Sequence, residues 1–259
     1  MYELNAIISI AYRDVLKFLR DRSRIVATFI FPFIFIGVLG GSLQSNLGGE
    51  VGFNFLTFMF TGVLAQTLFQ SAAAGIISLI EDRENDFSQE MFVSPVSRYT
   101  IIIGKILGES VVAYLQAVGV VVFALLIGVP MVFSQLVWLI PIGIIICLFG
   151  GAFGVLVMSQ LSSQRAANQI FPFLIFPQFF LAGVFTPMKH LPIYLFILSR
   201  ISPMTYAVDL ARGIYYLGKP EFNRLVIYNP VLDLIIITIF TILMITVGTF
   251  FFVRNERNR

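Results

Sequence analysis

The ionisable side chains are the part of this sequence that could do chemistry, and they lie in a few short segments. Five of the 14 carboxylates fall within residues 81–90, and Lys105 and Glu109 stand one helical turn apart inside an apolar stretch. The chain has one histidine, His190, and one cysteine, Cys147, so the sequence offers no cluster of metal ligands and no disulfide within the chain. Because no nucleophile stands in a pattern with a base, we expect the chain not to be an enzyme.

The two Gly-Lys pairs do not form a phosphate-binding loop. Gly104-Lys105 and Gly218-Lys219 lack the Ser or Thr that would hold magnesium and the upstream glycine at the required spacing. We therefore expect this chain to bind no ATP, Mg²⁺ or other cofactor itself. The excess of Lys and Arg over Asp and Glu is small, 17 against 14, and scattered, so we expect no nucleic-acid partner either.

The composition is that of a protein embedded in lipid. Hydrophobic residues make up 58% of the chain and charged residues only 12%, against about 25% in soluble domains. Ionisable side chains inside a membrane span are costly, so Lys105 and Glu109 are candidate functional residues. The sequence leaves two roles open for them, a structural ion pair or a part in a transport path.

We expect an all-α integral membrane protein with a single transmembrane domain over residues 1–259. Six apolar segments are predicted to cross the bilayer: residues 25–43, 53–80, 99–127, 136–158, 170–185 and 234–253. Pro32 is predicted to kink the first span. Two pairs of glycines at four-residue spacing, Gly37 with Gly41 and Gly150 with Gly154, predict close helix approach, either within one subunit or between two.

Residues 3–22 predict an amphipathic helix that lies on the membrane surface ahead of the first span. Its apolar positions fall on one helical stripe, and Arg13, Lys17 and Arg20 lie opposite. We expect this interfacial helix to precede the transmembrane part of the fold.

The charged segment 81–95 must lie in water between two apolar spans. Within it Phe87 and Met91 are four residues apart and share one helical face, whereas the neighbouring carboxylates point elsewhere. This arrangement predicts either a short helix that docks onto another protein or a solvated loop. The candidate contact residues are Glu81, Glu84, Phe87, Glu90, Met91 and Pro95.

The segment 187–217 is amphipathic, rich in proline and divided into runs too short to cross a bilayer core of about 30 Å. We expect two short helices, over residues 192–199 and 203–217, that dip into the outer leaflet as a re-entrant hairpin, with Ser202 as the N-cap of the second helix. Arg212 is predicted to reach back to the outer surface or to pair with Asp209.

The distribution of Lys and Arg predicts the orientation of the chain. Twelve lie on the side of the two termini and of residues 81–95, and five lie on the opposite side, all of them in the last loop. Because basic residues are enriched on the cytoplasmic side, we expect both termini in the cytoplasm and residues 44–50 outside. The chain should be a multi-pass protein of the cell membrane.

Two segments carry the most specific motifs. The first comprises Leu181-Ala182-Gly183-Val184-Phe185-Thr186-Pro187, Leu191-Pro192, Ile201-Ser202-Pro203-Met204-Thr205-Tyr206-Ala207-Val208-Asp209 and Arg212-Gly213, and the second Ser94-Pro95-Val96-Ser97-Arg98 with Gly104-Lys105. Together with the predicted spans they resemble the membrane subunits, or permeases, of type-2 ATP-binding-cassette (ABC) transporters, in the branch of drug and lipid exporters. Ser202 stands where that family usually has Asn, a mild departure because both residues cap helices.

The resemblance implies a transport subunit that forms the translocation pathway for an amphipathic drug or lipid-like substrate. It implies two permease copies, in a homodimer or heterodimer, and separate cytoplasmic ABC ATPase subunits that bind ATP and Mg²⁺. Residues 81–95 would then be the coupling helix on which the ATPases push, and the hairpin would close the outer end of the path. The family signature falls on Gly183, Pro187, Pro192, Ser202, Pro203, Tyr206 and Arg212.

Three other functions stay open at this point. A polysaccharide or teichoic-acid exporter permease would share the plan of six spans. A polytopic membrane enzyme would need paired acids or histidines at a membrane surface, whereas the acidic candidates outside residues 81–95 are widely spread along the chain. A proton-driven carrier would need buried carboxylates, and Glu109 is the one credible candidate.

Overall fold

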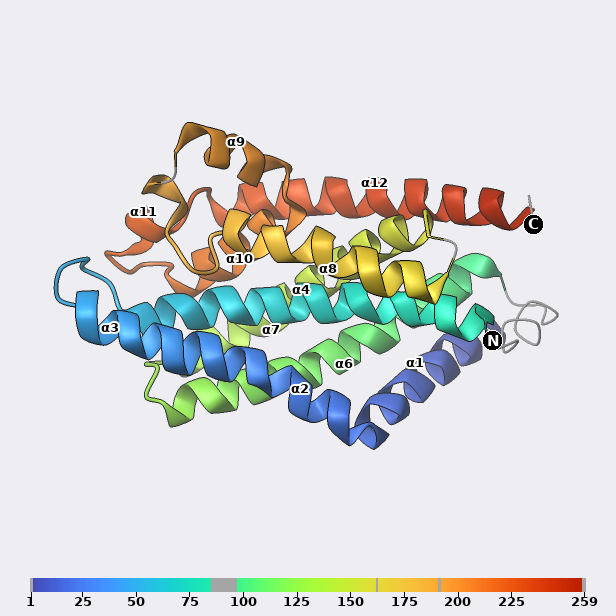
Figure 1. The fold of residues 1–259 in the computed structure, drawn as a ribbon, viewed down its shortest axis with the longest axis horizontal. Helices are drawn as coiled ribbons and strands as arrows, with labels where there is room; N and C mark the ends of the chain where they lie inside the picture. The colour runs from blue at the N-terminus through green and yellow to red at the C-terminus, as the bar shows by residue number, and fades with distance from the viewer. Residues whose placement is uncertain (1, 85–96, 162, 191, 258–259) are drawn as a thin grey trace.

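In the computed structural model the structure describes residues 2–84, 97–161, 163–190 and 192–257. All the regular secondary structure in these ranges is helical (Figure 1). The elements are α1 (Tyr2–Arg20), α2 (Arg22–Pro32), the π-helix η1 (Phe33–Gly40), α3 (Gly41–Leu47), α4 (Phe55–Glu84), α6 (Arg98–Leu126), α7 (Phe133–Met158), α8 (Gln164–Leu181), the 3₁₀ helix η2 (Met188–His190), α9 (Ile193–Ile201), α10 (Pro203–Tyr215), α11 (Phe222–Leu225) and α12 (Pro230–Arg257).

Five helical stretches among the described residues are long and apolar enough to cross a membrane. They are Arg22–Leu47, Phe55–Ile80, Thr100–Leu126, Phe133–Met158 and Phe222–Phe252. Each overlaps one of the predicted spans, so the polytopic, all-α prediction is confirmed at this level. Because α4 runs to Glu84, the first four residues of the predicted coupling helix continue a spanning helix. The rest of that helix, with Phe87, Glu90, Met91 and Pro95, lies outside the described residues, as do the side chains of Glu81 and Glu84.

The predicted span over residues 170–185 is not among these five stretches. Its helix, α8, covers 18 residues, and its first two turns carry polar side chains such as Arg165 and Asn168, which lower the mean hydropathy. The helix stops at Leu181, and the chain turns at Gly183, whose φ is 68°. The count of six spans is therefore not confirmed.

The first span is irregular from Pro32 onward. Proline cannot donate the backbone hydrogen bond of a regular turn, and here α2 ends at Pro32 and eight residues of π-helix follow. The predicted distortion at Pro32 therefore takes the form of a widened helix. Of the two glycines paired by their spacing on this span, Gly37 faces the ring of Phe123 in α6, whereas nothing lies within 4 Å of a Cβ built at Gly41.

Helix α1 packs along α6. Some of its apolar residues are buried against the protein, and others are exposed. Phe18 is buried in the protein, whereas Leu4 and Ile8 are 60% and 57% exposed. Asp14 is buried as well, so the side of α1 that faces the protein is not purely apolar. The exposed apolar residues are the ones left to face lipid.

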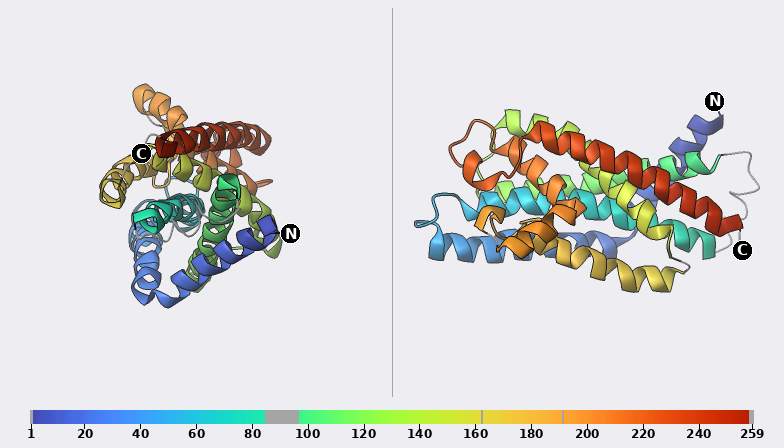
Figure 2. Two further views of the ribbon diagram at one scale, coloured as in Figure 1. Left: turned by 90° about the vertical axis from the view of Figure 1, so that its right-hand side faces the viewer. Right: turned by 90° about the horizontal axis from the view of Figure 1, so that it is seen from above.

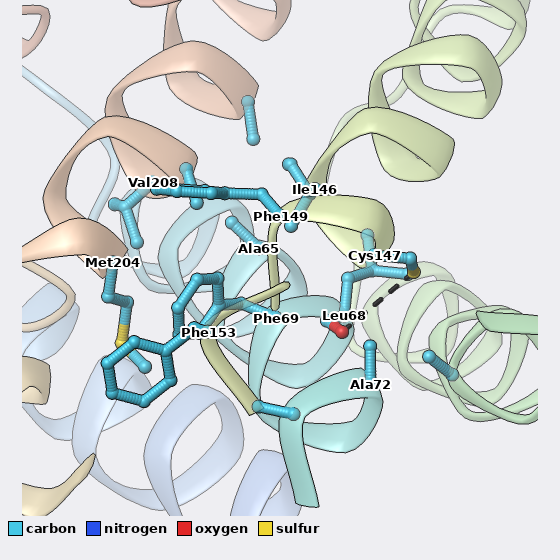
Figure 3. Close-up of a cluster of buried hydrophobic side chains, with 14 of the residues drawn as sticks. Ala65, Leu68, Phe69, Ala72, Ile146, Cys147, Phe149, Phe153, Met204 and Val208 are labelled. Carbon is cyan, nitrogen blue, oxygen red and sulfur yellow. Dashed lines mark hydrogen bonds between the residues drawn. The ribbon is translucent and has the colours of Figure 1, made fainter. Parts of the chain in front are cut away.

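Helix α4 lies at the centre of the bundle, against α6, α7 and α10 (Figure 2). In the core, Ala65, Leu68, Phe69 and Ala72 of α4 meet Ile146, Cys147, Phe149 and Phe153 of α7 and Met204 and Val208 of α10 (Figure 3). The Cys147 thiol donates to the carbonyl of Leu68 at 3.8 Å. Gly150 and Gly154 face the backbone of α4, so this glycine pair brings two helices of the same chain together.

The long helices run between two ends of the molecule. Both chain termini lie at one end, with the end of α4 and the start of α6 (Figures 1 and 2). The short helices α9, α10 and α11 lie at the other end, where the connection between α3 and α4 also lies (Figure 1). The same set of long helices thus holds the start of α6 and the signature residues at opposite ends of the bundle.

Candidate functional site: a charge network and a helical hairpin

Helix α1 is fastened to the first turn of α6 through one carboxylate. Glu3 accepts a hydrogen bond from the backbone N–H of Ser97 at 3.3 Å and another from the hydroxyl of Thr100. Ser97 is the N-cap of α6, and its own hydroxyl accepts the N–H of Thr100 at 3.1 Å. A carboxylate is favoured there by the unpaired N–H groups and by the helix dipole. The structure thus ties α1 to the point where α6 begins.

Two glycines bring the backbones of α1 and α6 close together. A Cβ atom at Gly104 would lie 3.2 Å from the Cα of Ile7, and one at Gly108 would lie 2.8 Å from the Cα of Ala11. This is the close approach that small residues at four-residue spacing permit between helices in membranes. Gly104 and Gly108 are four residues apart in the sequence, but they were not among the glycine pairs predicted to bring helices together. Because the backbones are so close, short polar side chains of α1 can reach α6.

Ionisable side chains meet where α1, α2 and α6 converge. The Nζ of Lys105 lies 2.8 Å from Oδ1 of Asp14 and 3.7 Å from Oε1 of Glu109. Nη2 of Arg24 lies 3.4 Å from Oε2 of Glu109. The side chains of Asp14, Lys105 and Glu109 are at most 2% exposed. We call Asp14, Arg24, Lys105 and Glu109 the charge network. At its edge, Nη2 of Arg13, which is more exposed, also lies 3.4 Å from Oδ1 of Asp14.

The predicted pair of Lys105 and Glu109 is present, but it is the longer of the two contacts that Lys105 makes in the charge network. Asp14 and Arg24 come from other helices, and sequence spacing could not pair them with α6. Buried charges cost several kcal/mol each unless they are paired, and removing one partner leaves another charge uncompensated. The alternation of two carboxylates with two cations therefore favours all four side chains staying together as a unit.

Helix α4 borders the charge network at Gly75. A Cβ atom at this position would overlap the carboxylate of Glu109. The glycine therefore leaves the space that Glu109 occupies between α4 and α6. A polar contact on α6 thus depends on a glycine in a neighbouring span, which sequence reasoning did not single out.

At the opposite end of the bundle, Arg212 of α10 is 1% exposed. Its Nη2 donates to the carbonyl oxygen of Gly183 at 3.0 Å, and its guanidinium carbon lies 4.0 Å from the centre of the Phe58 ring. The prediction that Arg212 reaches the outer surface is wrong. A guanidinium can be buried when a carbonyl and an aromatic face replace water, as they do here.

Asp209, the other expected partner of Arg212, is bound to the backbone instead. Its carboxylate accepts the N–H of Ile227 at 2.9 Å and that of Tyr228 at 2.8 Å. These bonds attach α10 to the segment that precedes α12. The predicted ion pair is thus replaced by backbone contacts, because the chain returns past α10 before the last span begins.

The start of α10 is held by an amide of α8. Ser202 occupies the N-cap position and Pro203 the first turn, as predicted, but the Ser202 hydroxyl makes no cap bond. It donates to Oε1 of Gln178 at 3.2 Å, and the same oxygen accepts the N–H of Met204 at 3.3 Å. Gln178 is 7% exposed. The sequence signal that we missed is a single amide in the apolar part of α8 that follows Gln169.

The remaining signature residues lie around this connection. The Tyr206 hydroxyl donates to the carbonyl of Arg200 at 2.8 Å, which spans the turn between α9 and α10. Pro192 precedes α9, and Pro187 borders a hollow of about 480 Å³ that is also lined by Phe53. The structure therefore brings Gly183 to Arg212 and fixes the turn at Ser202, whereas Pro187 and Pro192 bound the hairpin.

Comparison with known proteins decides the family. The sequence pattern of the family described as ABC-2 type transporter matches residues 5–216, which is more than half of the 259 residues. The chain belongs to this ABC-2 transporter family. The resemblance to the permeases of type-2 ABC transporters is thereby confirmed at the level of the family.

The relatives of this ABC-2 membrane domain include two proteins named as transport permeases and one named as a nodulation protein. Transport permease ycf38 of Cyanophora paradoxa is 25% identical over 74% of this chain and 67% of that protein. A probable multidrug ABC transporter permease, YbhR, of Escherichia coli K12 is 27% identical over 62% of this chain but only 43% of that protein. Nodulation protein J of Rhizobium leguminosarum bv. trifolii is 28% identical over 73% of this chain and 72% of that protein.

The geometry of this ABC-2 membrane domain suits mechanical coupling. Hydrogen bonds, close backbone approach and the charge network join α1 and α2 to the first half of α6. At the other end, α8, α10 and the segment before α12 are joined through Gln178, Asp209 and Arg212. Neither set supplies a nucleophile with an adjacent base among the described side chains. Both can hold helices in a fixed relation while the chain changes shape.

Proposed function

We propose that this chain is the permease subunit of an ATP-driven exporter for an amphipathic drug or lipid-like substrate. Two copies would form the pathway, and separate cytoplasmic ATPase subunits would bind and hydrolyse ATP. The observation that carries the proposal is the match to the ABC-2 transporter family over residues 5–216. The relative named a multidrug permease supports the amphipathic class of substrate.

Residues 81–95 would receive the motion of the ATPases, with the apolar pair Phe87 and Met91 in the contact and the carboxylates around it. Since α6 begins directly after this segment, a displacement would enter α6 at Ser97. The bonds of Glu3 and the charge network would carry it to α1 and α2. The first span would then move with the coupling segment, and the pathway between the two copies would change shape.

The hairpin of α9 and α10 would close the outer end of the pathway. Two observations support this role. The hairpin lies at the end of the bundle opposite the termini (Figure 1). The bond of Gln178 connects it to α8, and the bond of Arg212 connects it to the turn at Gly183 that follows α8. If the hairpin dips into the outer leaflet without crossing, both termini stay in the cytoplasm, as the charge distribution predicts.

Reconstitution tests this function. We expect the chain to co-purify with an ATPase that has a phosphate-binding loop, and Phe87→Asp with Met91→Asp to abolish that association, because charge buried in an interface is costly. The matched variant Phe87→Leu with Met91→Leu keeps the apolar ridge and should retain the ATPase. Undiminished association of the aspartate variant would refute the coupling role.

The substrate class is tested with the same complex. In proteoliposomes, amphipathic drugs and lipids should stimulate ATP hydrolysis, and a polysaccharide or teichoic-acid fragment should not. Stimulation by the polysaccharide alone would assign the chain to the polysaccharide exporters, which share this plan of spans. An active complex with no dependence on ATP would reject an ATP-driven exporter altogether.

A further inference from the structure

A polar hollow of about 230 Å³ lies between α2, α4 and α6, within the part of the bundle assigned to the membrane. Its polar lining comes from three helices: Arg24 and Thr28 of α2, Gln66, Thr67, Gln70 and Ser71 of α4, and Gln116 of α6. On α4 the lining residues recur at positions 66, 67, 70, 71 and 74, which is one face of a helix. The sequence shows this stripe of amides and hydroxyls on α4, but it does not show which helices the stripe faces.

Two of these side chains are buried with polar atoms left over. Gln66 is 2% exposed; its amide nitrogen donates to Oε1 of Gln70 at 2.9 Å, while its own Oε1 has no protein partner. Ser71 is 8% exposed, and its hydroxyl has no partner either. A buried polar atom without a partner is unfavourable, and more so in a membrane. Both side chains line the hollow, so a group bound there would supply the missing hydrogen bonds.

The lining also sets the chemistry of that group. The free Oε1 of Gln66 can only accept, so the ligand must bring a hydroxyl or N–H donor, and the Ser71 hydroxyl can both donate and accept. Arg24 is the one charged side chain among the described lining residues. One of its nitrogens faces Glu109 at 3.4 Å, and the guanidinium has further donors for an anionic oxygen. The lining thus suits an anion that carries hydroxyl groups and disfavours a cation.

The size of the hollow limits how much of a ligand it can enclose. Pockets for whole drug-sized ligands occupy roughly 300–1,000 Å³, so about 230 Å³ is room for a head group and not for a complete amphipathic molecule. The hollow is partly open, and α2 on its flank has exposed apolar residues such as Ile30, next to which an apolar tail could lie in lipid.

We propose that this hollow binds the anionic, hydroxyl-bearing head group of the transported amphipath, with Arg24 at the anionic oxygen and Gln66 and Ser71 at the hydroxyl groups. The proposal rests on the proposed export function and narrows its substrate class. It also places the head group beside the charge network, since Arg24 belongs to both. A bound anion on Arg24 would compete with Glu109, which connects the site to α6.

Cysteine protection in the full-length chain tests the site. Thr28→Cys in a Cys147→Ser background places a thiol in the hollow, and its alkylation by a maleimide is followed in phosphatidylcholine nanodiscs. The probes are dihexanoyl phosphatidylglycerol, sn-glycerol 3-phosphate and dodecyltrimethylammonium. We expect the phosphatidylglycerol to slow alkylation, the glycerol phosphate to act only at much higher concentration, and the cation to have no effect.

Two substitutions separate binding from folding. Gln66→Leu and Ser71→Ala remove the unpartnered atoms, so each should raise the half-protecting concentration by about tenfold, the effect of about 1.4 kcal/mol. The thermal midpoint of Ser71→Ala should stay level or rise, because only an unpartnered hydroxyl is lost, whereas Gln66→Leu also removes the donor to Gln70 and should lower the midpoint slightly. Thr238→Val is the matched control, because Thr238 is exposed on α12 and bonds only to its own helix, at the carbonyl of Leu234. It should leave protection unchanged.

Several results would overturn the proposal. One is that the lipid protects the Gln66→Leu variant as well as it protects the parent. Another is that the cation protects as well as the phosphatidylglycerol does. A third is that glycerol phosphate protects as strongly as the lipid, which would assign the hollow to a soluble anion. Normal protection in both Gln66→Leu and Ser71→Ala, with a lowered thermal midpoint in Gln66→Leu alone, would make the amide structural. Failure of ATPase association would refute the export function instead, whereas ATP-driven transport without any protection would refute this site alone.

Discussion

The ammonium group of Lys105, in α6, lies 2.8 Å from a carboxylate oxygen of Asp14, in α1, and both side chains are at most 1% exposed. This contact connects residues 91 positions apart in the chain. It joins the helix that precedes the first span to the helix that follows residues 85–96. An amphipathic helix and a spanning helix are thereby held together by charge as well as by apolar packing.

Removing the cation from this contact should destabilise the protein. In Lys105→Met the buried carboxylates of Asp14 and Glu109 lose their shared partner. They keep Arg13 and Arg24, respectively, each at 3.4 Å. We expect a loss of about 3–5 kcal/mol in unfolding free energy. The double variant Asp14→Leu with Lys105→Met leaves Glu109 with Arg24 and should recover most of the loss. Thermal unfolding in nanodiscs measures both, and additive losses in the double variant would contradict a coupled network.

Space for Glu109 should depend on Gly75. Gly75→Ala places a Cβ atom on the Glu109 carboxylate and should lower the thermal midpoint, and adding Glu109→Ala should restore part of it. Gly41→Ala is the matched control, because nothing lies within 4 Å of its Cβ position and alanine favours the helix. If the two alanine variants behave alike, the close approach of α4 to Glu109 is not present in the membrane.

The buried guanidinium in the hairpin should not be replaceable by another cation. Arg212→Lys keeps the charge but loses the planar group that lies over Phe58 and reaches Gly183, so we expect lower thermal stability and loss of transport in proteoliposomes. Arg224→Lys, at an exposed position of α11, should behave as the parent. Full activity of Arg212→Lys would show that a positive charge is sufficient at this position and that the planar guanidinium is not needed.

The orientation of the chain is tested by cysteine labelling of intact cells. In a Cys147→Ser background, Ser45→Cys should react with an impermeant maleimide, because residues 44–50 are predicted to lie outside. Arg254→Cys, near the C-terminus, should react only after the membrane is breached. The reverse pattern would invert the predicted topology.

Acid should weaken the start of α2. Asp21 is the N-cap and accepts the hydroxyl of Ser23 at 2.6 Å and the N–H of Arg24 at 2.9 Å. The Ser23 bond first, and then the Arg24 bond, lower the pKa of Asp21 below its ordinary value. Its contribution is therefore complete above the unfolded pKa of about 3.9 and is lost as the pH falls through the lower folded value.

The measurement for Asp21 is the thermal midpoint as a function of pH. Asp21→Asn keeps a capping oxygen without a charge, so the part of the acid sensitivity that belongs to this residue should disappear while the cap remains. An unchanged pH profile in Asp21→Asn would show that the acid sensitivity of the fold arises elsewhere.

Local features of the sequence were sufficient for the class of fold. Apolar length and helical periodicity depend on consecutive residues, so five spans, the helix ahead of them and the two short helices after Pro187 could be predicted with bounds close to those observed. The pair of Lys105 and Glu109 was predictable for the same reason, since residues four apart in a helix face each other. The family could be recognised because its motifs are also short and contiguous.

Contacts between distant segments were decided only by the tertiary structure. Which side of α1 faces α6, and hence that Asp14 reaches Lys105, depends on how closely Gly104 and Gly108 let the helices approach. Arg212 binds a carbonyl and an aromatic ring because the turn at Gly183 and the face of α4 surround it, whereas its own helix offered only Asp209. Sequence spacing determines which side chains share a helical face, but the partner of that face is set by packing among helices far apart in the chain.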